Sequence, residues 1–175
     1  MAAQRQADVT PHLTGPIYGV GLLFILLPIM DTISQVWPPS FGSPSWRYGL
    51  VGIGANYLIS ILFGLLLVCL VASFQWHRRV LRWMAIASSV FAVFAVIAAI
   101  GFVLDALQLR PGLPRDNRGA LRMFDIGAGK ALFKYLVTAV AFAWLGFGAW
   151  RAARAIPAPV EADTTPKLVH KQEGA

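Results

Sequence analysis

Charged side chains inside or beside long apolar stretches are the residues of this chain that could do chemistry. They are two acids and three bases: Asp31, Asp105, Arg47, Lys130 and Lys134. Charge in an apolar setting is costly, so such groups usually pair with one another or hold an ion or a proton. Asn56 adds an uncharged polar group within another apolar stretch. These six residues form the candidate site.

No other group of residues has the spacing of a known catalytic, cofactor or metal site. The three histidines fall in tails or turns, and none pairs with Cys or Glu at metal spacing: His12, His77 and His170. The glycine-rich segment 127–130 is not a phosphate-binding loop, because the first glycine of that motif would fall on Phe124 and its hydroxyl residue on Ala131. We therefore predict no catalytic residues, no cofactor and no metal.

The candidate residues are carried by four apolar runs that are each long enough to cross a bilayer. The chain is 57% apolar and only 13% charged, and about 20 helical residues span the hydrocarbon core. The predicted spans are residues 15–37, 48–74, 80–107 and 131–150. The fold class is therefore an all-α membrane protein, a bundle of four transmembrane helices over residues 15–154. A polar N-terminal tail (1–14) and a disordered C-terminal tail (155–175) flank it.

Two further features refine these helices. Pro28 should kink or end the first span, because proline lacks the N–H that the helix needs. Before the fourth span, Asp116 or Asn117 can cap a helix that begins near residue 118. Its apolar and charged faces predict a short interfacial amphipathic helix, which runs into the fourth span unless glycine breaks it. The residues concerned are Leu121, Phe124 and Ala128 on one face, Arg118, Arg122 and Asp125 on the other, and Gly127 and Gly129 as possible breaks.

Small residues repeat at helical spacing and predict where the helices touch. The third span carries the clearest stripe: Ala85, Ser88, Ala92, Ala95 and Ala99. Weaker motifs are Gly15 with Gly19, Ser60 with Gly64, and Ala139 with Ala143 and Gly146. We expect these stripes to pack helices within one chain, while a homo-dimer remains an alternative.

The basic residues indicate a membrane rather than nucleic acid as the partner of the +7 chain, because many of them stand at the ends of apolar runs. Four spans place both tails and the 75–79 turn on one side, with eight of the 15 Lys and Arg residues. The clusters 78–82 and 151–154 favour cytoplasmic tails in a bacterial inner membrane. The same parity places the five charged candidates together on the opposite side, where they could form one ionic network.

The segments 46–47, 104–110, 124–125 and 130–134 form a pattern that resembles a group of small bacterial four-span proteins of unassigned function. The resemblance covers about residues 45 to 154. It implies the four-span architecture and no activity.

Two hypotheses follow for function. The first is a non-enzymatic accessory or scaffold component of a membrane assembly, whose charged side meets a membrane protein partner. The second is a small transporter or ion-coupled carrier that uses Asp31 and Asp105 as ion or proton sites. A plainer interpretation is that the bases reach lipid headgroups while the acids pin helix ends.

Overall fold

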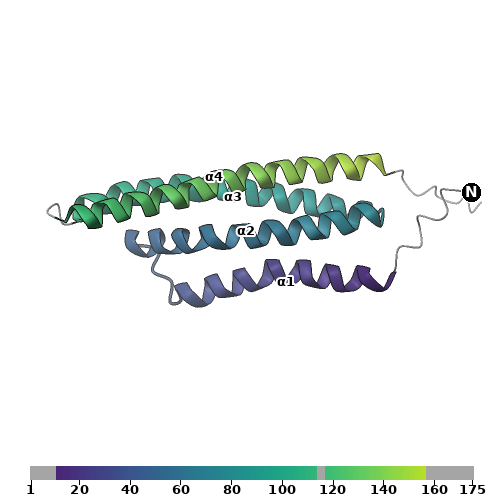
Figure 1. Cartoon of the computed structure of the whole chain (residues 1–175), viewed down its shortest axis with the longest axis horizontal. Helices are drawn as coiled ribbons and strands as arrows, with labels where there is room; N and C mark the ends of the chain where they lie inside the picture. Colours follow the sequence, from purple (N-terminus) through teal and green to yellow (C-terminus); the bar gives the residue numbers. More distant parts are fainter. Residues whose placement is uncertain (1–10, 114–116, 157–175) are drawn as a thin grey trace, which may run out of the picture.

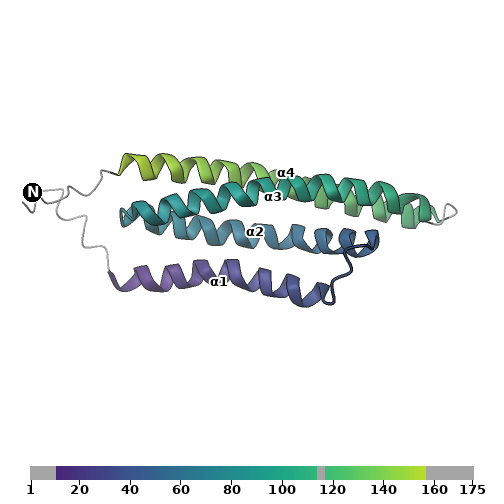
Figure 2. The same cartoon turned by 180° about the vertical axis from the view of Figure 1, so that it is seen from behind.

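The computed structural model describes residues 11–113 and 117–156 and consists there of four long antiparallel helices without strands (Figures 1 and 2). All four are long and apolar enough to cross a membrane, which confirms the all-α class with four candidate spans. A short 3-10 turn, η2, follows the third helix. The elements are α1 (Pro11–Val36), α2 (Pro44–Phe74), α3 (Arg78–Leu109), η2 (Arg110–Gly112) and α4 (Arg118–Ala155).

Helices α2, α3 and α4 pack against one another, whereas α1 packs mainly against α2 and flanks this three-helix core (Figure 1). The largest fully buried side chains come from the core helices and include Leu65, Phe102 and Phe142. Large apolar side chains of α1 stay exposed along most of its length, as expected for a helix bordered by lipid rather than by protein.

The small-residue stripe of α3 is an interface, as predicted. Its members Ala85, Ala95 and Ala99 are buried and Ala92 is half-buried. On the facing helix, a Cβ built on Gly146 would lie 3.2 Å from the carbonyl oxygen of Ala85. A larger residue there would push the two helices apart by a few tenths of an ångström, so the small residues of the stripe allow the close approach of α3 and α4.

Helix α1 crosses α2 at a pair of glycines, of which the sequence predicted one. A Cβ on Gly64 would lie 2.6 Å from the carbonyl oxygen of Gly21. The predicted contact through Gly15 and Gly19 is wrong, since nothing lies within 4 Å of a Cβ at either position. The face of α1 that meets α2 contains Gly21 and the buried Pro28, seven residues and two helical turns apart, whereas Gly15 and Gly19 point elsewhere.

Pro28 does not end α1, which continues to Val36. The hydroxyl of Thr32 donates a hydrogen bond of 2.7 Å to the Pro28 carbonyl oxygen. Asp31 therefore lies on an unbroken helix.

The amphipathic stretch before the fourth span is not a separate helix. It is the first part of α4, which runs unbroken through Gly127 and Gly129. The backbone N–H of Ala120 donates a 3.0 Å hydrogen bond to the Asn117 side chain, which confirms one of the two predicted caps. The predicted faces are present, with apolar residues half-buried and charged ones exposed: Leu121, Phe124 and Ala128 against Arg118, Arg122 and Asp125. Asp116 and most of both predicted tails lie outside the described residues.

Candidate functional site

Arg47 and Asp105 form the centre of the candidate site. Arg47 stands in the first turn of α2 and Asp105 near the end of α3, and the antiparallel packing of these helices brings the two ends together. The Arg47 Nη2 atom lies 2.6 Å from Asp105 Oδ1, and the Nε atom of Arg47 lies 3.2 Å from both oxygens of the Asp105 carboxylate. The side chain of Asp105 is 8% exposed and that of Arg47 is 36% exposed. The pair therefore has the charge-assisted, forked geometry that holds a carboxylate firmly.

The neighbourhood of this ion pair leaves little freedom to either partner. Arg47 Nη1 donates a 2.7 Å hydrogen bond to the carbonyl oxygen of Phe41, which ties the α1–α2 loop to the guanidinium. One turn before Asp105, the Phe102 ring stacks on Tyr48 at 4.6 Å, and Tyr48 stacks on Phe124 at 5.2 Å. These rings bind α2, α3 and α4 together beside the pair, so the acid is a fixed structural partner of the base.

A second polar contact joins α2 to α4. The ammonium of Lys134 donates a hydrogen bond to Asn56 Oδ1 at 2.5 Å, so these two candidate residues meet each other. Next to it, the hydroxyl of Tyr135 donates a 2.7 Å hydrogen bond to the carbonyl oxygen of Val51. Tyr135 is only 2% exposed. Sequence reasoning missed it, although a phenol inside an apolar span signals a need for a partner.

Asp31 and Lys130 are both exposed, and neither forms an ion pair with any residue that the structure describes. All five charged candidates lie toward the same end of the helices, as helix parity predicted (Figure 1). They nevertheless do not form one network. The reason is the position of α1, which packs mainly on α2 and so separates Asp31 from the bases of α4.

A second ion pair near this end was not predicted. Arg110 Nη2 lies 3.0 Å from Asp125 Oδ2, and the two side chains are 57% and 47% exposed. They flank the loop between α3 and α4, so their opposite charges on either side of one short loop could have predicted the pair. Exposed pairs contribute little to stability, and this one serves mainly to hold η2 beside α4.

We name this half of the molecule the paired end, defined by Arg47, Asp105, Lys134, Arg110 and Asp125. Among the described residues, no group of three or more His, Cys, Asp or Glu could hold a metal ion. Comparison of the chain with protein-family models, curated proteins and solved structures found no match. The site must therefore be interpreted from its own geometry.

Proposed function

We propose that this protein is a non-enzymatic accessory or scaffold component of a bacterial inner-membrane assembly. The observation that carries the proposal is the Arg47–Asp105 pair, in which the buried acid is closed off by the guanidinium. A carboxylate engaged in this way fixes the ends of two helices and has no free oxygen directed at a passing ion.

The competing hypothesis is an ion-coupled carrier that uses Asp31 and Asp105. A carrier needs its acids to face a water-filled cavity. The two best-defined surface grooves of the described residues, of about 790 and 310 Å³, are lined by neither acid. Asp31 alone has the exposure that a carrier would require, so the carrier hypothesis now depends on that one residue.

The surface proposed to meet a partner is the projecting hairpin of α3 and α4. Figure 1 shows both helices extending past the start of α2 and the end of α1. At about 1.5 Å per residue, α4 is roughly 57 Å long, well over the ~30 Å hydrocarbon core. Its first two turns expose Arg118 and Arg122, and Lys130 is exposed further along the helix; none of the three forms an ion pair within the described residues. We infer a partner with an acidic surface beside the membrane.

The tails are proposed to lie in the cytoplasm, which places the projecting hairpin on the outer side. Arginines abut the helix ends beside both tails, at positions 78–82 and 151–154. A single cysteine at position 130 would test this orientation in a Cys69→Ala background. Labelling of intact cells by a membrane-impermeant thiol reagent supports the proposed orientation, and labelling only after permeabilisation reverses it.

Site-specific crosslinking tests the scaffold proposal. A photo-crosslinking residue at Arg122 should trap one discrete protein partner in native membranes, and Arg118→Gln with Lys130→Gln should abolish that product. The same crosslinker at Leu136, an exposed apolar position of α4, is the matched control and should trap lipid. The absence of a charge-dependent product at Arg122 would refute the proposed partner surface.

Reconstitution tests the carrier hypothesis separately. Proteoliposomes with an imposed membrane potential and an internal pH dye should show no proton flux above that of protein-free vesicles. A flux that Asp31→Asn abolishes, without loss of thermal stability, would instead establish a carrier and overturn the scaffold proposal.

A further inference from the structure

The groove of about 790 Å³ lies between α3 and α4, far from the paired end. It opens outward. Small residues, among them Ala92 and Ala143, line it together with larger ones such as Ile86, Val93 and Trp150. Within a bilayer such an apolar furrow faces the acyl chains directly.

Arginines surround the end of this groove that lies nearer the tails. Arg82 precedes the lining residue Ile86 by one turn of α3, and Arg154 follows the lining residue Trp150 by one turn of α4. The guanidinium of Arg151 lies 5.7 Å from the centre of the Phe147 ring, and that of Arg154 lies 5.2 Å from the Trp150 ring. Both rings line the groove, so cation–π contacts hold these cations at its mouth.

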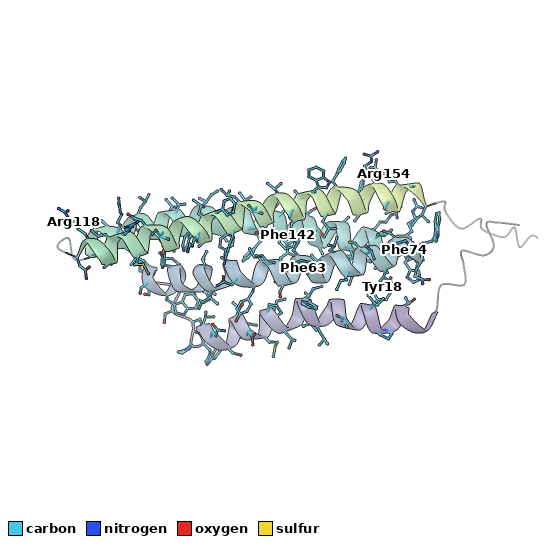
Figure 3. The ribbon with its side chains drawn as sticks, in the orientation of Figure 1. Tyr18, Phe63, Phe74, Arg118, Phe142 and Arg154 are labelled. Carbon is cyan, nitrogen blue, oxygen red and sulfur yellow. The ribbon has the colours of Figure 1, made fainter. Side chains whose placement is uncertain are left out.

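We name this region the arginine end, defined by Arg78, Arg79, Arg82, Arg151 and Arg154. The acids among the described residues are Asp31, Asp105 and Asp125, and all three lie toward the other end of the helices. Figure 3 shows Arg154 and Arg118 at opposite ends of α4. The arginine end therefore concentrates positive charge without an acidic partner from the described part of the chain.

The groove and the arginine at its mouth together match the thickness of one leaflet of a bilayer. From Arg82 to the lining residue Val93, the rise along α3 is about 16 Å. Half of the ~30 Å hydrocarbon core is about 15 Å. An acyl chain that enters beside the arginines would thus reach the bilayer midplane where the groove ends.

We propose that this groove is a binding site for an anionic phospholipid, whose phosphate contacts Arg82, Arg151 and Arg154 while one acyl chain fills the furrow. A helix from a second copy is a poorer occupant. Copies inserted with the same topology would bring two arginine ends side by side, and their like charges would repel. The site does not depend on the scaffold proposal, because it lies on other residues at the other end.

Quenching of Trp150 by brominated lipids tests the site on the purified full chain in neutral detergent. The signal of Trp150 is the difference between the wild-type protein and Trp150→Phe. Phosphatidylglycerol with mid-chain bromines should reach half-maximal quenching at least tenfold lower in mole fraction than the matching phosphatidylcholine. Each arginine near an anionic membrane surface raises the affinity about fivefold, so a tenfold preference from three arginines is expected.

Two variants separate the headgroup from the acyl chain. The triple variant Arg82→Gln, Arg151→Gln, Arg154→Gln should remove the preference for phosphatidylglycerol and leave the weaker quenching by phosphatidylcholine. Ala143→Leu should reduce quenching by both lipids, because Ala143 lines the groove and the added carbons take up part of its volume. Thermal unfolding of each variant verifies that it is folded.

Matched controls act at other positions of α4. Arg118→Gln with Arg122→Gln removes charge from the paired end and should leave the preference unchanged. Gly148→Val adds as many carbons as Ala143→Leu, at a position with nothing within 4 Å, and should not reduce quenching.

Several results would overturn the proposal. These are equal quenching by the two lipids, an equal loss of preference in the Arg118/Arg122 control, and relief of quenching by inorganic phosphate alone, which would indicate an anion site without an acyl chain. A dimer that shields Trp150 from both lipids would assign the groove to a second copy instead.

Discussion

Two sets of arginines at opposite ends of this helical bundle differ in whether the protein neutralises their charge. At the paired end, Arg47 closes on a buried acid and Arg110 on an exposed one. At the arginine end, Arg82, Arg151 and Arg154 have no acidic partner among the described residues, and two of them rest on aromatic rings. Arg47 and Arg110 are therefore neutralised within the protein, whereas the arginine end, like the exposed Arg118 and Arg122, is left to its surroundings.

This difference follows from where the chain places its acids. An arginine that meets a carboxylate inside a low-dielectric contact becomes part of the fold, because separating the pair would leave an uncompensated charge. An arginine at an exposed helix end contributes little to folding and is available to headgroups or partners. Removing a partner of either ion pair at the paired end should therefore weaken the fold, whereas removing charge at the arginine end should affect only interactions.

The largest effect is expected from Asp105→Asn. The substitution keeps the shape of the side chain but leaves Arg47 without its counter-charge. Breaking a buried pair typically costs about 3–5 kcal/mol, and the partial exposure of Arg47 lowers our expectation to about 2 kcal/mol. Thermal or denaturant unfolding in a neutral detergent measures the change.

The control for this prediction is the double variant Arg47→Met with Asp105→Asn. Removing both charges should restore part of the lost stability, because no uncompensated cation remains. Additive effects of the two substitutions would show that the pair does not couple α2 to α3, and would remove the main distinction between the two ends.

Tyr135→Phe should have the next largest effect. It deletes the hydroxyl that donates to the Val51 carbonyl oxygen in the buried contact of α2 with α4. The expected loss is about 1 kcal/mol, typical of one intramolecular hydrogen bond. Tyr57→Phe, at a half-buried tyrosine of α2 whose hydroxyl accepts from Gln35, is the matched comparison. An equal loss in both variants would contradict a special role for the buried phenol.

Much of this architecture was predictable from the sequence, because its signals are long and regular. Four apolar runs predicted four helices, and the alanine-rich stripe of α3 predicted its interface. The parity of the helices also placed Arg47 and Asp105 at the same end, where the structure joins them. Each of these inferences depends on periodicity along one helix or on the number of crossings.

The remaining features depend on which helices are neighbours, and periodicity does not contain that information. The sequence did not show that α1 would pack mainly on α2, so Asp31 was expected in a network that it does not join. The α1 contact glycine is Gly21 rather than Gly15 or Gly19, because the facing helix selects it. The sequence also did not show whether α4 continues through its two glycines, because each costs a helix about 1 kcal/mol. In the structure the helix does continue, because its packing against α3 outweighs that cost.

Arg110→Gln removes the exposed ion pair of the paired end. Its ion pair with Asp125 is about half exposed on both sides, so we expect a loss of only about 0.5 kcal/mol. The loss should shrink further in high salt, because solvent-exposed charges are screened. A loss as large as that of Asp105→Asn would show that burial does not govern the strength of these pairs.

The smallest effect is expected at the arginine end itself. Arg82→Gln with Arg151→Gln removes two cations that have no acidic partner within the described residues, so the unfolding free energy in neutral detergent should change by no more than about 0.5 kcal/mol. Relief of repulsion among the neighbouring arginines would even raise it slightly. The same variant measured with added phosphatidylglycerol should lack the stabilisation that the wild-type protein gains, because a ligand stabilises only the state that binds it. A large loss of stability without lipid would mean that these arginines belong to the fold after all, as Arg47 does.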